Sequence, residues 1–514
     1  MKYKNEILLL IISSVILTPI LFFPLSNDLS IFHHAAKAII NGEKLYVDFI
    51  DIKPPFAYVI FIPIVLFSGH SEFILRLSDF IIQLLLIFLL FKIIQKKTSN
   101  NFIPIVAAFI YSFAYVAFNF NQTMQLESFM GFIVLLLIAV QVSENNKNYI
   151  WLIRGILLGL LISIKFTVIV VYFAFIIDDF ISNKKENPYF KQGLTFIGFL
   201  ITLLLANIIL LDSEIFYGFS DSLKYLMNYG SQPPWNFEYV KFSLKQISHF
   251  LADNLSLAIL ILFLFGVIFN LKNGLNDGSK RLYNFSLTIL IFLFATIILE
   301  RKYFEYHFLR IYVPISIIAA FGFYELIKEL NEKILKFDLQ TKFISISVLI
   351  FFLFFSPLPR WFQTLIPTYY YFLSKEKYDL FYERQWTSSV LRKTTIDIAS
   401  FINQRISPKD RVLVISNINN QLNFFIEKGI KSRFALSCFY LSSYNIDNFE
   451  KLFYNELKTA DWLVVQTNDG NIYAMGHLFS SYDALIKNKV FGQLFLENFY
   501  EVKDFRLFKV FARK

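Results

Sequence analysis

The chain has 514 residues, of which 56% are hydrophobic and only 17% are charged, and its mean hydropathy is +0.52. This composition excludes an ordinary soluble globular protein and indicates an integral membrane protein. The formal net charge of +10 does not indicate a nucleic-acid partner, because the basic residues recur in short segments between apolar runs instead of forming one patch.

Long apolar runs follow one another through the first 358 residues. A helix needs roughly 20 apolar residues to cross the hydrocarbon core, and on that measure we predict about eleven crossings, with ten to thirteen as the range. The predicted spans are 5–25, 77–95, 102–120, 127–143, 150–165, 166–181, 191–211, 252–271, 283–299, 306–326 and 342–358. The fifth and sixth are short on either side of Lys165, so they could also be one broken helix.

The basic residues between the spans predict the topology, because cytoplasmic loops collect Lys and Arg. With the N-terminus in the cytoplasm every inner loop is basic, whereas the outer turn 119–126 has no Lys or Arg. An odd number of spans then places everything after Pro357 outside the cytoplasm. We expect a multi-pass protein of the inner or plasma membrane, with a cytoplasmic N-terminus and a periplasmic C-terminal domain.

The first extracytoplasmic loop is predicted at residues 26–76. Its start, Ser-Asn-Asp at 26–28, offers helix N-caps, and Asn-Gly at 41–42 is a stop signal. Lys-Pro-Pro at 53–55 fixes a turned or extended backbone. The apolar run 56–69 is too short and too interrupted by proline to cross the membrane. The loop should therefore hold helices that lie in the membrane interface.

In the first of these helices, the apolar side chains fall on one face, while His33, His34 and Lys37 fall largely on the other. The two histidines are adjacent and do not have the spacing of metal ligands, and the chain has a single cysteine, Cys438. We expect no metal site and no internal disulfide. A divalent cation stays an open alternative that no motif indicates, and no cofactor is predicted.

The composition changes after Pro357, and charged residues become frequent from Lys375 onward. The runs 411–416, 433–437 and 461–466 read as strands separated by helical stretches, which predicts a small α/β domain. It has no phosphate loop or GxGxxG motif. The predicted domains are a transmembrane domain at 1–358, a connector at 359–397 and an extracytoplasmic α/β domain at 398–514. The expected fold class is thus an all-α polytopic membrane domain with a small α/β domain.

Four groups of residues occur in an order that resembles a known superfamily. In the first loop the group consists of Asp28, Gly42, Tyr46, Asp48, Lys53, Pro54, Pro55, Gly69 and Arg76. The later groups are NQTMQLESF with Glu127, the run with Gly155, Gly159 and Lys165, and KYFEYHFLRIYVP with His307 and Arg310. Their order resembles the polytopic C-type-fold glycosyltransferases, which include protein O-mannosyltransferases, lipid A aminoarabinose transferases and lipopolysaccharide-modifying relatives.

The resemblance implies that a sugar moves from a polyprenyl-phosphate carrier to a hydroxyl acceptor on the extracytoplasmic face, with inversion. Such a reaction needs a carboxylate that takes the acceptor's proton and cations that stabilise the departing phosphate. The implied catalytic residues are Asp28 and Glu127. Candidates for binding the donor phosphate are Lys53, Arg76, Lys165, His307 and Arg310, and Tyr46, Asp48, Pro54 and Pro55 would support the loop. The partners would be the bilayer, the lipid-linked sugar and an acceptor lipid, glycan or protein.

Structural alternatives exist for these residues. Asp28 could cap the interfacial helix, and Glu127 could interact with its own helix dipole. Lys53 and Arg76 could be interfacial charges that reach water, and His307 could have a structural role. A polysaccharide polymerase or oligosaccharide ligase is the alternative function. A transporter fits less well, because the sequence shows no internal repeat and its ionisable residues gather at one outer face.

Overall fold

A computed structural model describes residues 4–98, 100–144, 147–182, 187–232, 234, 236–253, 257–273, 275–334, 350–351, 354–383 and 391–514. The chain divides into two compact units. We call the first, Met1–Phe23, Phe73–Ala206 and Trp235–Tyr369, the helical unit, and the second, Pro24–Glu72, Asn207–Pro234 and Tyr370–Lys514, the mixed unit. The domains predicted from the sequence were consecutive, whereas each unit combines three separate segments. The first loop therefore groups with the C-terminal part of the chain.

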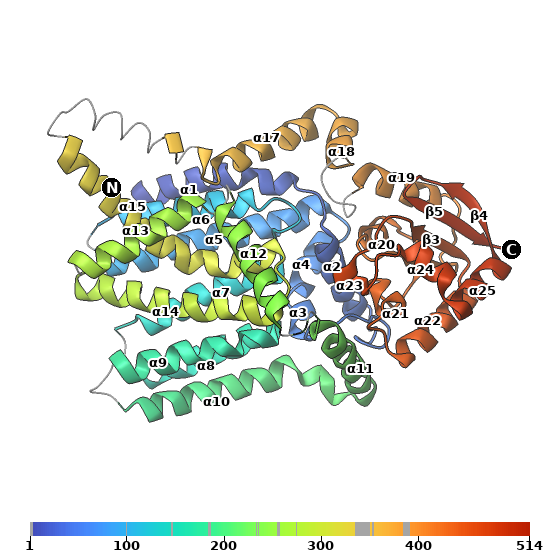
Figure 1. The fold of residues 1–514 in the computed structure, drawn as a ribbon, viewed down its shortest axis with the longest axis horizontal. Coiled ribbons are helices and arrows are strands. Elements are labelled where there is room, and N and C mark those ends of the chain that lie inside the picture. Colours follow the sequence, from blue (N-terminus) through green and yellow to red (C-terminus); the bar gives the residue numbers. More distant parts are fainter. Residues whose placement is uncertain are drawn as a thin grey trace. The chain divides into compact units, whose positions relative to one another are not determined.

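The helical unit contains most of the apolar segments, and Figure 1 shows many of its helices running in nearly the same direction. Its elements are α1 (Lys4–Leu17), η1 (Thr18–Phe22), α5 (Glu72–Lys97), α6 (Phe102–Ala117), α7 (Leu126–Gln141), α8 (Asn148–Ile164), η2 (Phe166–Val171), α9 (Tyr172–Ser182), α10 (Pro188–Ala206), α12 (Phe237–Ala252), α13 (Leu257–Asn273), α14 (Asp277–Glu300), η4 (Glu305–Ile311), α15 (Tyr312–Ile334) and most of α17 (Leu358–Leu373). Each predicted span from 5–25 to 306–326 contains helix. The last predicted span, 342–358, lies largely outside the described residues.

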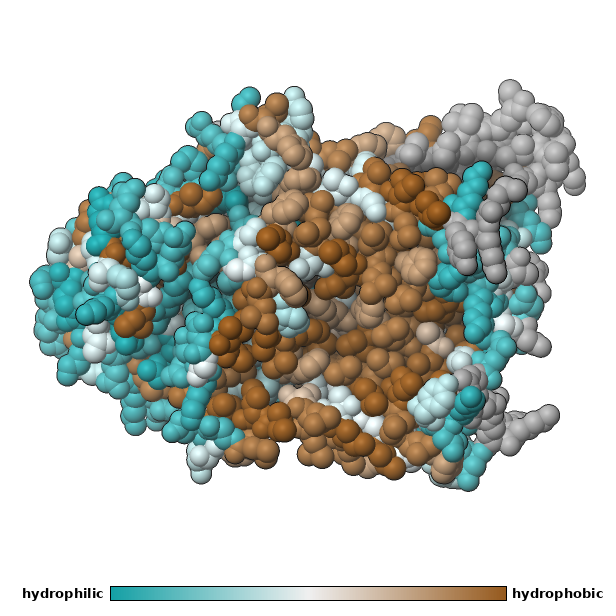
Figure 2. All heavy atoms as spheres, turned by 180° about the vertical axis from the view of Figure 1, so that it is seen from behind, coloured by the Kyte–Doolittle hydropathy of each residue, from teal (hydrophilic) through white to brown (hydrophobic). Residues whose placement is uncertain are grey.

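Five helical segments of the described chain are long and apolar enough to cross a membrane, judged by length and composition: Lys4–Phe22, Glu72–Lys97, Pro188–Ala206, Gly278–Glu300 and Glu305–Leu330. Figure 2 shows a broad apolar surface over the helical unit. On α10, for example, the side chains of Leu204 and Leu205 are 73% and 64% exposed. Such a surface is stable against lipid and not against water, and the chain is a multi-pass membrane protein. The number of crossings stays a prediction.

Glycines bring α8 and α10 together. A Cβ atom at Gly155 would lie 1.9 Å from the Thr195 carbonyl oxygen, and one at Gly159 would lie 2.6 Å from the Thr202 Cβ. Small residues allow this close approach of two helix backbones, as is common between membrane helices. The helix α8 then ends at Ile164, and Lys165 has an extended backbone (φ −156°, ψ 115°) before η2 begins. The predicted interruption at Lys165 is therefore present.

The mixed unit contains a five-stranded sheet, which confirms the small α/β region. The strands are β1 (Arg411–Ile415), β2 (Ile430–Lys431), β3 (Trp462–Gln466), β4 (Phe499–Asp504) and β5 (Phe508–Arg513), in the order β2-β1-β3-β5-β4. β2 and β3 are parallel to β1, and β5 is antiparallel to both β3 and β4. The helices after the connector are α18 (Lys375–Glu383), α19 (Arg392–Asn403), α20 (Gln421–Phe425), α21 (Cys438–Leu441), α22 (Asp447–Thr459), α23 (Ile472–Met475), α24 (Ser481–Lys487) and α25 (Lys489–Asn498).

One strand prediction in this region was wrong. The run 433–437 forms no strand, and only Phe434 makes an isolated bridge, with Ile50 of the first loop. The Ile50 amide donates to the Arg433 carbonyl oxygen at 2.6 Å, and the Ala435 amide donates to the Ile50 carbonyl oxygen at 3.1 Å. The side chains of Phe434 and Ala435 are buried. The apolar pattern thus reflects burial of an irregular segment against the first loop.

The first loop forms α2 (Asn27–Ile40), α3 (Phe56–Val59) and α4 (Ile62–Ser68), and η3 (Ile208–Leu211) and α11 (Ser213–Gly230) belong to the same unit. The predicted start and stop of α2 are confirmed: the Ser26 hydroxyl accepts from the Leu29 amide, and Gly42 has a positive φ of 84°. His33 falls on the polar side of α2 by its spacing, and the structure buries its side chain, which is 2% exposed. Its ring lies 4.8 Å from the Phe424 ring of α20, which packs against that face.

Candidate active site

Four charged residues meet inside the helical unit, each at an end of a helix. Glu127 lies in the first turn of α7, and Lys165 lies in the break after α8. Glu300 ends α14, where Arg301 turns the chain with a left-handed backbone (φ 57°), and Arg310 lies in η4. Because the chain leaves regular helix at these points, polar side chains from separate segments can gather there.

The four residues form a closed network of ion pairs. The Arg310 guanidinium donates from Nη2 to Glu127 Oε1 at 3.0 Å and from Nη1 and Nη2 to the two Glu300 oxygens at 2.6 and 2.8 Å. The Lys165 ammonium lies 2.7 Å from Glu127 Oε1 and 2.9 Å from Glu300 Oε2. Two cations thus balance two carboxylates, which offsets the cost of burying each charge.

Access to the network is unequal. The side chain of Lys165 is 22% exposed, whereas those of Glu127, Glu300 and Arg310 are 3%, 5% and 0% exposed. Arg310 is also held by Thr296, whose hydroxyl oxygen lies 3.0 Å from Nη1. An incoming anion would therefore reach the Lys165 ammonium first, while Arg310 stays fixed by its partners.

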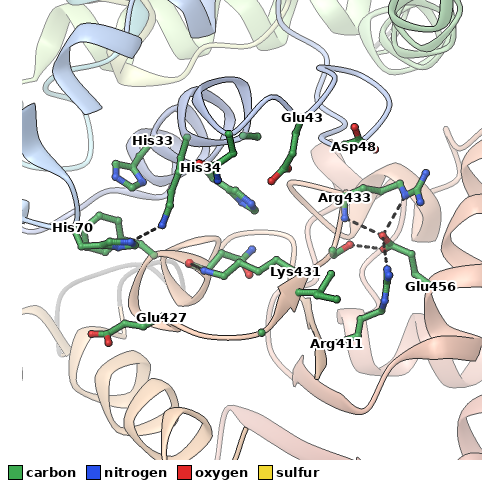
Figure 3. Close-up of a pocket in the computed structure, with 18 residues that line it drawn as sticks. His33, His34, Glu43, Asp48, His70, Arg411, Glu427, Lys431, Arg433 and Glu456 are labelled. Carbon is green, nitrogen blue, oxygen red and sulfur yellow. Dashed lines mark hydrogen bonds and ion pairs between the residues drawn. The ribbon is translucent and has the colours of Figure 1, made fainter. Parts of the chain in front are cut away.

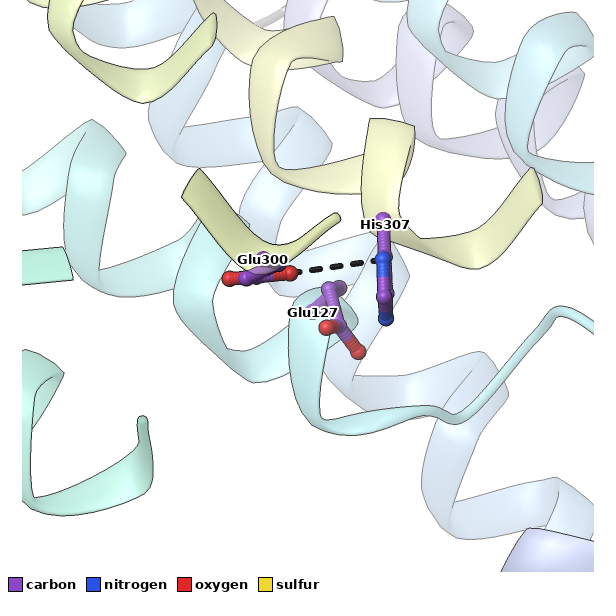
Figure 4. A group of neighbouring side chains, drawn as sticks. All are labelled: Glu127, Glu300 and His307. Atoms are coloured by element: carbon purple, nitrogen blue, oxygen red, sulfur yellow. Dashed lines mark ion pairs between the residues drawn. The ribbon is translucent and has the colours of Figure 1, made fainter. Parts of the chain in front are cut away.

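His307 lies beside this network. Its Nδ1 is 2.5 Å from the Lys302 carbonyl oxygen and 3.3 Å from Glu300 Oε2. A carbonyl oxygen only accepts hydrogen bonds, so Nδ1 carries the proton in this geometry. Figure 4 shows the side chains of Glu127, Glu300 and His307 close together, and their ligand-type atoms all lie within 4.8 Å of one another. Both carboxylates are already neutralised by Lys165 and Arg310, so a cation there would have to displace these contacts.

The sequence prediction placed Glu127, Lys165, His307 and Arg310 in one site with Asp28, Lys53 and Arg76. Only the first four meet in the network, and the prediction missed Glu300. Glu300 is the last residue of α14 and directly follows the predicted span 283–299. The available signal was an acidic side chain at the outer end of an apolar run, which is the same kind of position that Glu127 occupies. The structure adds Glu300 as the carboxylate that pairs with Lys165, His307 and Arg310.

Arg76 lies on α5, and its side chain is 1% exposed. Its guanidinium donates from Nη2 to the Phe120 carbonyl oxygen at 3.0 Å and from Nη1 to the Thr123 hydroxyl at 3.1 Å. These acceptors belong to the turn that leads into α7 and hence to Glu127. Arg76 thus positions that turn, and its predicted contact with a donor phosphate stays a prediction.

Asp28 is half-buried in the first turn of α2 in the mixed unit. The alternative that Asp28 is the N-cap is wrong, because Ser26 supplies the cap hydrogen bond. A carboxylate in the first turn is still favoured by the helix dipole. Burial raises the pKa of the Tyr229 hydroxyl, and the nearby charge of Asp28 contributes to that shift. Asp28 therefore lies close enough to Tyr229 of α11 for an electrostatic interaction.

The Lys-Pro-Pro segment is held in place by two buried tyrosines. The Tyr46 hydroxyl donates to the Lys53 carbonyl oxygen at 2.6 Å, and the Lys53 amide donates to the Tyr58 hydroxyl at 3.1 Å. Burial raises the pKa of both tyrosine hydroxyls well above the usual range, so they stay protonated. The Lys53 ammonium lies 3.1 Å from Asp51 Oδ2 and 5.1 Å from the centre of the Phe32 ring.

The other predicted supporting residues shape the loop backbone. Pro55 precedes α3 with a helical backbone (φ −54°, ψ −42°), and the Pro54 carbonyl oxygen accepts from the Ala57 amide at 3.0 Å. Asp48 Oδ2 accepts from the Lys44 amide at 2.8 Å. The Lys44 ammonium in turn pairs with two acidic residues next to and within α11, at 3.0 and 2.8 Å. The loop is thereby tied to the 207–234 segment of its own unit.

Comparisons with known proteins agree with the sequence resemblance. Residues 52–210 match the family model described as dolichyl-phosphate-mannose-protein mannosyltransferase. This segment contains Lys53, Arg76, Glu127 and Lys165. A search of curated protein sequences finds no match.

Solved structures share the fold of the whole chain. The chain is similar to ArnT from Cupriavidus metallidurans in the apo state, with 12% identity and a TM-score of 0.59, and bound to undecaprenyl phosphate, with 11% identity and a TM-score of 0.55. Both comparisons cover 100% of this chain and 98% of that one. An oligosaccharyltransferase from Archaeoglobus fulgidus, in complex with zinc and sulfate, is similar with 11% identity and a TM-score of 0.50 over 98% of this chain and 73% of that one. The chain therefore has the fold of the C-type polytopic glycosyltransferases.

Proposed function

We propose that the protein is a membrane glycosyltransferase that moves a sugar from a polyprenyl-phosphate donor to a hydroxyl acceptor, with inversion at the anomeric carbon. The observation that carries this proposal is the network of Glu127, Lys165, Glu300 and Arg310, which places two cations at helix ends in a protein of this fold. That ArnT was solved with undecaprenyl phosphate bound supports the choice of donor.

In this proposal, the donor phosphate approaches Lys165. The ammonium is the most exposed of the four charged groups, and it can exchange a carboxylate contact for a phosphate oxygen. As the bond between the anomeric carbon and the phosphate oxygen breaks, negative charge grows on the departing phosphate. Cations that are already in place stabilise that charge without reorganisation, which typically contributes several kcal/mol. Arg310, held by Glu127, Glu300 and Thr296, adds a fixed positive charge.

An apolar groove supports a donor with a prenyl chain. It has a volume of about 270 Å³ in the helical unit, and its lining includes Phe250, Phe263, Leu290, Phe294, Ile311 and Tyr312. Ile311 and Tyr312 directly follow Arg310 in the chain. A lipid phosphate needs an apolar channel next to a cationic site, and this arrangement provides both within the same part of the helical unit.

The proton acceptor in this proposal is the carboxylate of Asp28. The acceptor oxygen attacks the anomeric carbon, the carbon–oxygen bond to phosphate breaks with its electron pair on phosphate, and the hydroxyl proton passes to the carboxylate. Glu127 is the second carboxylate that the sequence resemblance implies. Its two ion pairs suit it to positioning Lys165 and Arg310.

The proposal includes the membrane topology. The N-terminus would be cytoplasmic, and the first loop and the α/β region would lie on the extracytoplasmic side, where lipid-linked sugars are used. The domain boundaries that the sequence predicts, 1–358, 359–397 and 398–514, belong to the same proposal.

The similarity to an oligosaccharyltransferase supports transfer of an oligosaccharide as the alternative reaction.

The test compares cells with and without the gene. Loss of the gene should cause a lipid-linked sugar to accumulate and the same sugar to disappear from a surface lipid, glycan or protein. The wild-type gene should reverse both changes, and the Asp28→Asn variant should not. Asp447→Asn is the matched control, because Asp447 also lies in the first turn of a helix in the mixed unit. Unchanged lipid-linked sugars and surface glycans in the deletion strain would contradict the proposal.

A further inference from the structure

A polar pocket of about 460 Å³ lies within the mixed unit, between α2 of the first loop and the segment that contains α20 and β2. Figure 3 shows the Lys431 side chain crossing the pocket, with His33, His34 and His70 at one end and Arg411, Arg433 and Glu456 at the other. None of these residues belongs to the network around Arg310. The pocket is therefore a second candidate ligand site.

The end with the two arginines is internally paired. Glu456 Oε1 accepts from the Arg433 Nε at 3.2 Å and lies 3.8 Å from an Arg411 nitrogen, and Glu456 Oε2 accepts from the Ser432 hydroxyl at 2.7 Å. Glu456 is 2% exposed. A buried carboxylate with these partners is a structural anchor, and it neutralises much of the positive charge at this end.

The opposite end holds the ammonium groups of Lys37 and Lys431. Burial lowers the pKa of both groups, and the nearby charges of Glu43 on Lys37 and of Glu427 on Lys431 act in the opposite direction. Lys431 Nζ donates to the Ile426 carbonyl oxygen at 2.6 Å and also to the Asn423 carbonyl oxygen, and Lys37 Nζ donates to His70 Nε2 at 2.6 Å. Within the described parts of the chain, neither ammonium forms an ion pair with a carboxylate. An ammonium has three N–H donors, so donors on both groups remain for a ligand.

The histidines add a second observation. In the described residues, the buried Nδ1 atom of His34 has no hydrogen-bond partner. The His33 Nε2 is 2.6 Å from the Gly69 carbonyl oxygen, so this nitrogen already has a partner. A buried polar atom without a partner beside a polar cavity indicates that a ligand or water completes it.

We infer that this pocket binds a phosphorylated sugar, with the phosphate between Lys37 and Lys431. A phosphate supplies several charged acceptor oxygens, with which the two ammonium groups can form the ion pairs that they do not make with carboxylates in the described residues. The cavity falls in the range of roughly 300–1,000 Å³ that is typical of small-molecule sites, so it has room for more than an inorganic anion. Asn41, Glu43 and Asn423 also line it, and their polar groups can bond to hydroxyl groups.

The inference does not depend on the proposed transfer reaction, because binding can be measured without a lipid-linked donor. The experiment uses the full-length protein in detergent and titrates glucose 1-phosphate, glucose and inorganic phosphate by calorimetry. Glucose 1-phosphate should bind with saturation and more tightly than either glucose or inorganic phosphate. Absence of saturable binding would overturn the inference. Equal affinity for inorganic phosphate would overturn the sugar part of it.

Two variants locate the binding. Lys37→Met keeps the apolar stem of a half-buried side chain and should weaken glucose 1-phosphate binding about tenfold or more, as expected for the loss of a charge-assisted hydrogen bond. Lys451→Met is the matched control, because Lys451 is an exposed lysine on α22 outside the pocket. The control should bind like the wild type. An equal effect of both variants, or no effect of Lys37→Met, would place the binding elsewhere.

Discussion

Glu127 and Glu300 accept hydrogen bonds from the same guanidinium and from the same ammonium, although they begin and end different helices. The Arg310 guanidinium lies 3.0 Å from Glu127 Oε1 and 2.6 Å from Glu300 Oε1. The Lys165 ammonium lies 2.7 Å from Glu127 Oε1 and 2.9 Å from Glu300 Oε2. Each carboxylate is therefore needed to balance the two cations. This relationship makes the network sensitive to the loss of any one charge.

Replacing Glu300 by Gln should disturb the network. Arg310 and Lys165 would then share a single carboxylate, and breaking a buried ion pair costs about 3–5 kcal/mol. We expect the apparent unfolding temperature of Glu300→Gln to fall clearly below that of the wild type, measured on the detergent-purified protein. Glu238→Gln changes an exposed residue of α12 and should leave it unchanged. Equal unfolding temperatures for Glu300→Gln and the wild type would show that the network does not stabilise the fold.

Replacing Lys165 by Met should impair sugar transfer more than folding. The variant loses the exposed cation that we assign to the donor phosphate, and removal of one such group typically lowers the rate about 10²–10³-fold. Lys165→Arg keeps the charge and should retain part of the activity. Lys280→Met is the control, since Lys280 is exposed on α14. Full activity of Lys165→Met would remove Lys165 from the mechanism.

Glu72 and Arg392 should stabilise the mixed unit together. Nη1 and Nη2 of Arg392 donate to the two Glu72 carboxylate oxygens at 2.8 and 2.7 Å. The Nε of Arg392 donates to Asp379 Oδ1 at 2.8 Å. Because Glu72 is partly exposed, we expect Glu72→Gln to lower the free energy of unfolding by only about 1–3 kcal/mol. A double-mutant cycle with Arg392→Met should give a coupling energy of similar size. Effects that simply add would contradict a direct pairing.

Glycine substitutions test the contact between α8 and α10. A Cβ atom at Gly155 would lie 1.9 Å from a backbone oxygen of α10, whereas one at Gly193 would meet nothing within 4 Å. Gly155→Ala should therefore strongly reduce the yield of folded protein, and Gly193→Ala should not. Size-exclusion chromatography of the two purified variants measures the difference. Equal yields would mean that the two helices can separate without cost.

The phosphorylated-sugar pocket should respond to pH through Lys431. Burial and the charge of Lys37 lower the pKa of Lys431 to about 7, while burial lowers the pKa of His33 to about 4 and that of His34 to about 3. The other titratable or charged groups that line the pocket are Lys37, Glu43, Asp48, His70, Arg411, Glu427, Arg433 and Glu456. Below about pH 7 the amine of Lys431 is protonated, and its positive charge strengthens the binding of an anion. Above about pH 7 the amine is neutral, and this contribution to binding is lost.

Sulfate is the suitable probe, because its charge does not change between pH 6 and 8. Its affinity should decrease as the pH rises through about 7, which is the pKa of Lys431. In Lys431→Arg, whose guanidinium stays charged, the affinity should be nearly independent of pH. A wild-type affinity that does not change over this range would exclude Lys431 as the titrating group.

Much of the site could be predicted because its residues interrupt apolar segments. Glu127, Lys165 and Arg310 are charged positions at the predicted outer ends of spans. All outer ends lie near the same surface of the membrane, so these side chains were expected at a similar depth. Glu300 occupies the same kind of position but was assigned to a connecting segment. Their pairing depends on which helices are neighbours, and this information is not contained in local periodicity.

Which segments of the chain make up the mixed unit could not be predicted from the sequence. Residues 24–72 and 207–234 group with the C-terminal part of the chain through contacts between distant segments, such as the isolated bridge of Ile50 with Phe434. For the same reason, the buried irregular run 433–437 resembled a strand, because an apolar pattern does not distinguish the two. The spacing put His33 on the polar side of α2, and packing of α20 against that side buries it.

The central claim is that the protein transfers a sugar from a polyprenyl-phosphate donor. The most direct measurement reconstitutes the purified full-length protein in lipid with a radiolabelled polyprenyl-phosphate sugar and an acceptor fraction prepared from the gene-deletion strain. The account predicts that labelled acceptor and free polyprenyl phosphate appear in equal amounts with the wild type. Neither should appear with Asp28→Asn, and with Lys165→Met both should appear about 10²–10³-fold more slowly. Intact donor after incubation with the wild-type protein, or equal turnover by all three proteins, would contradict it.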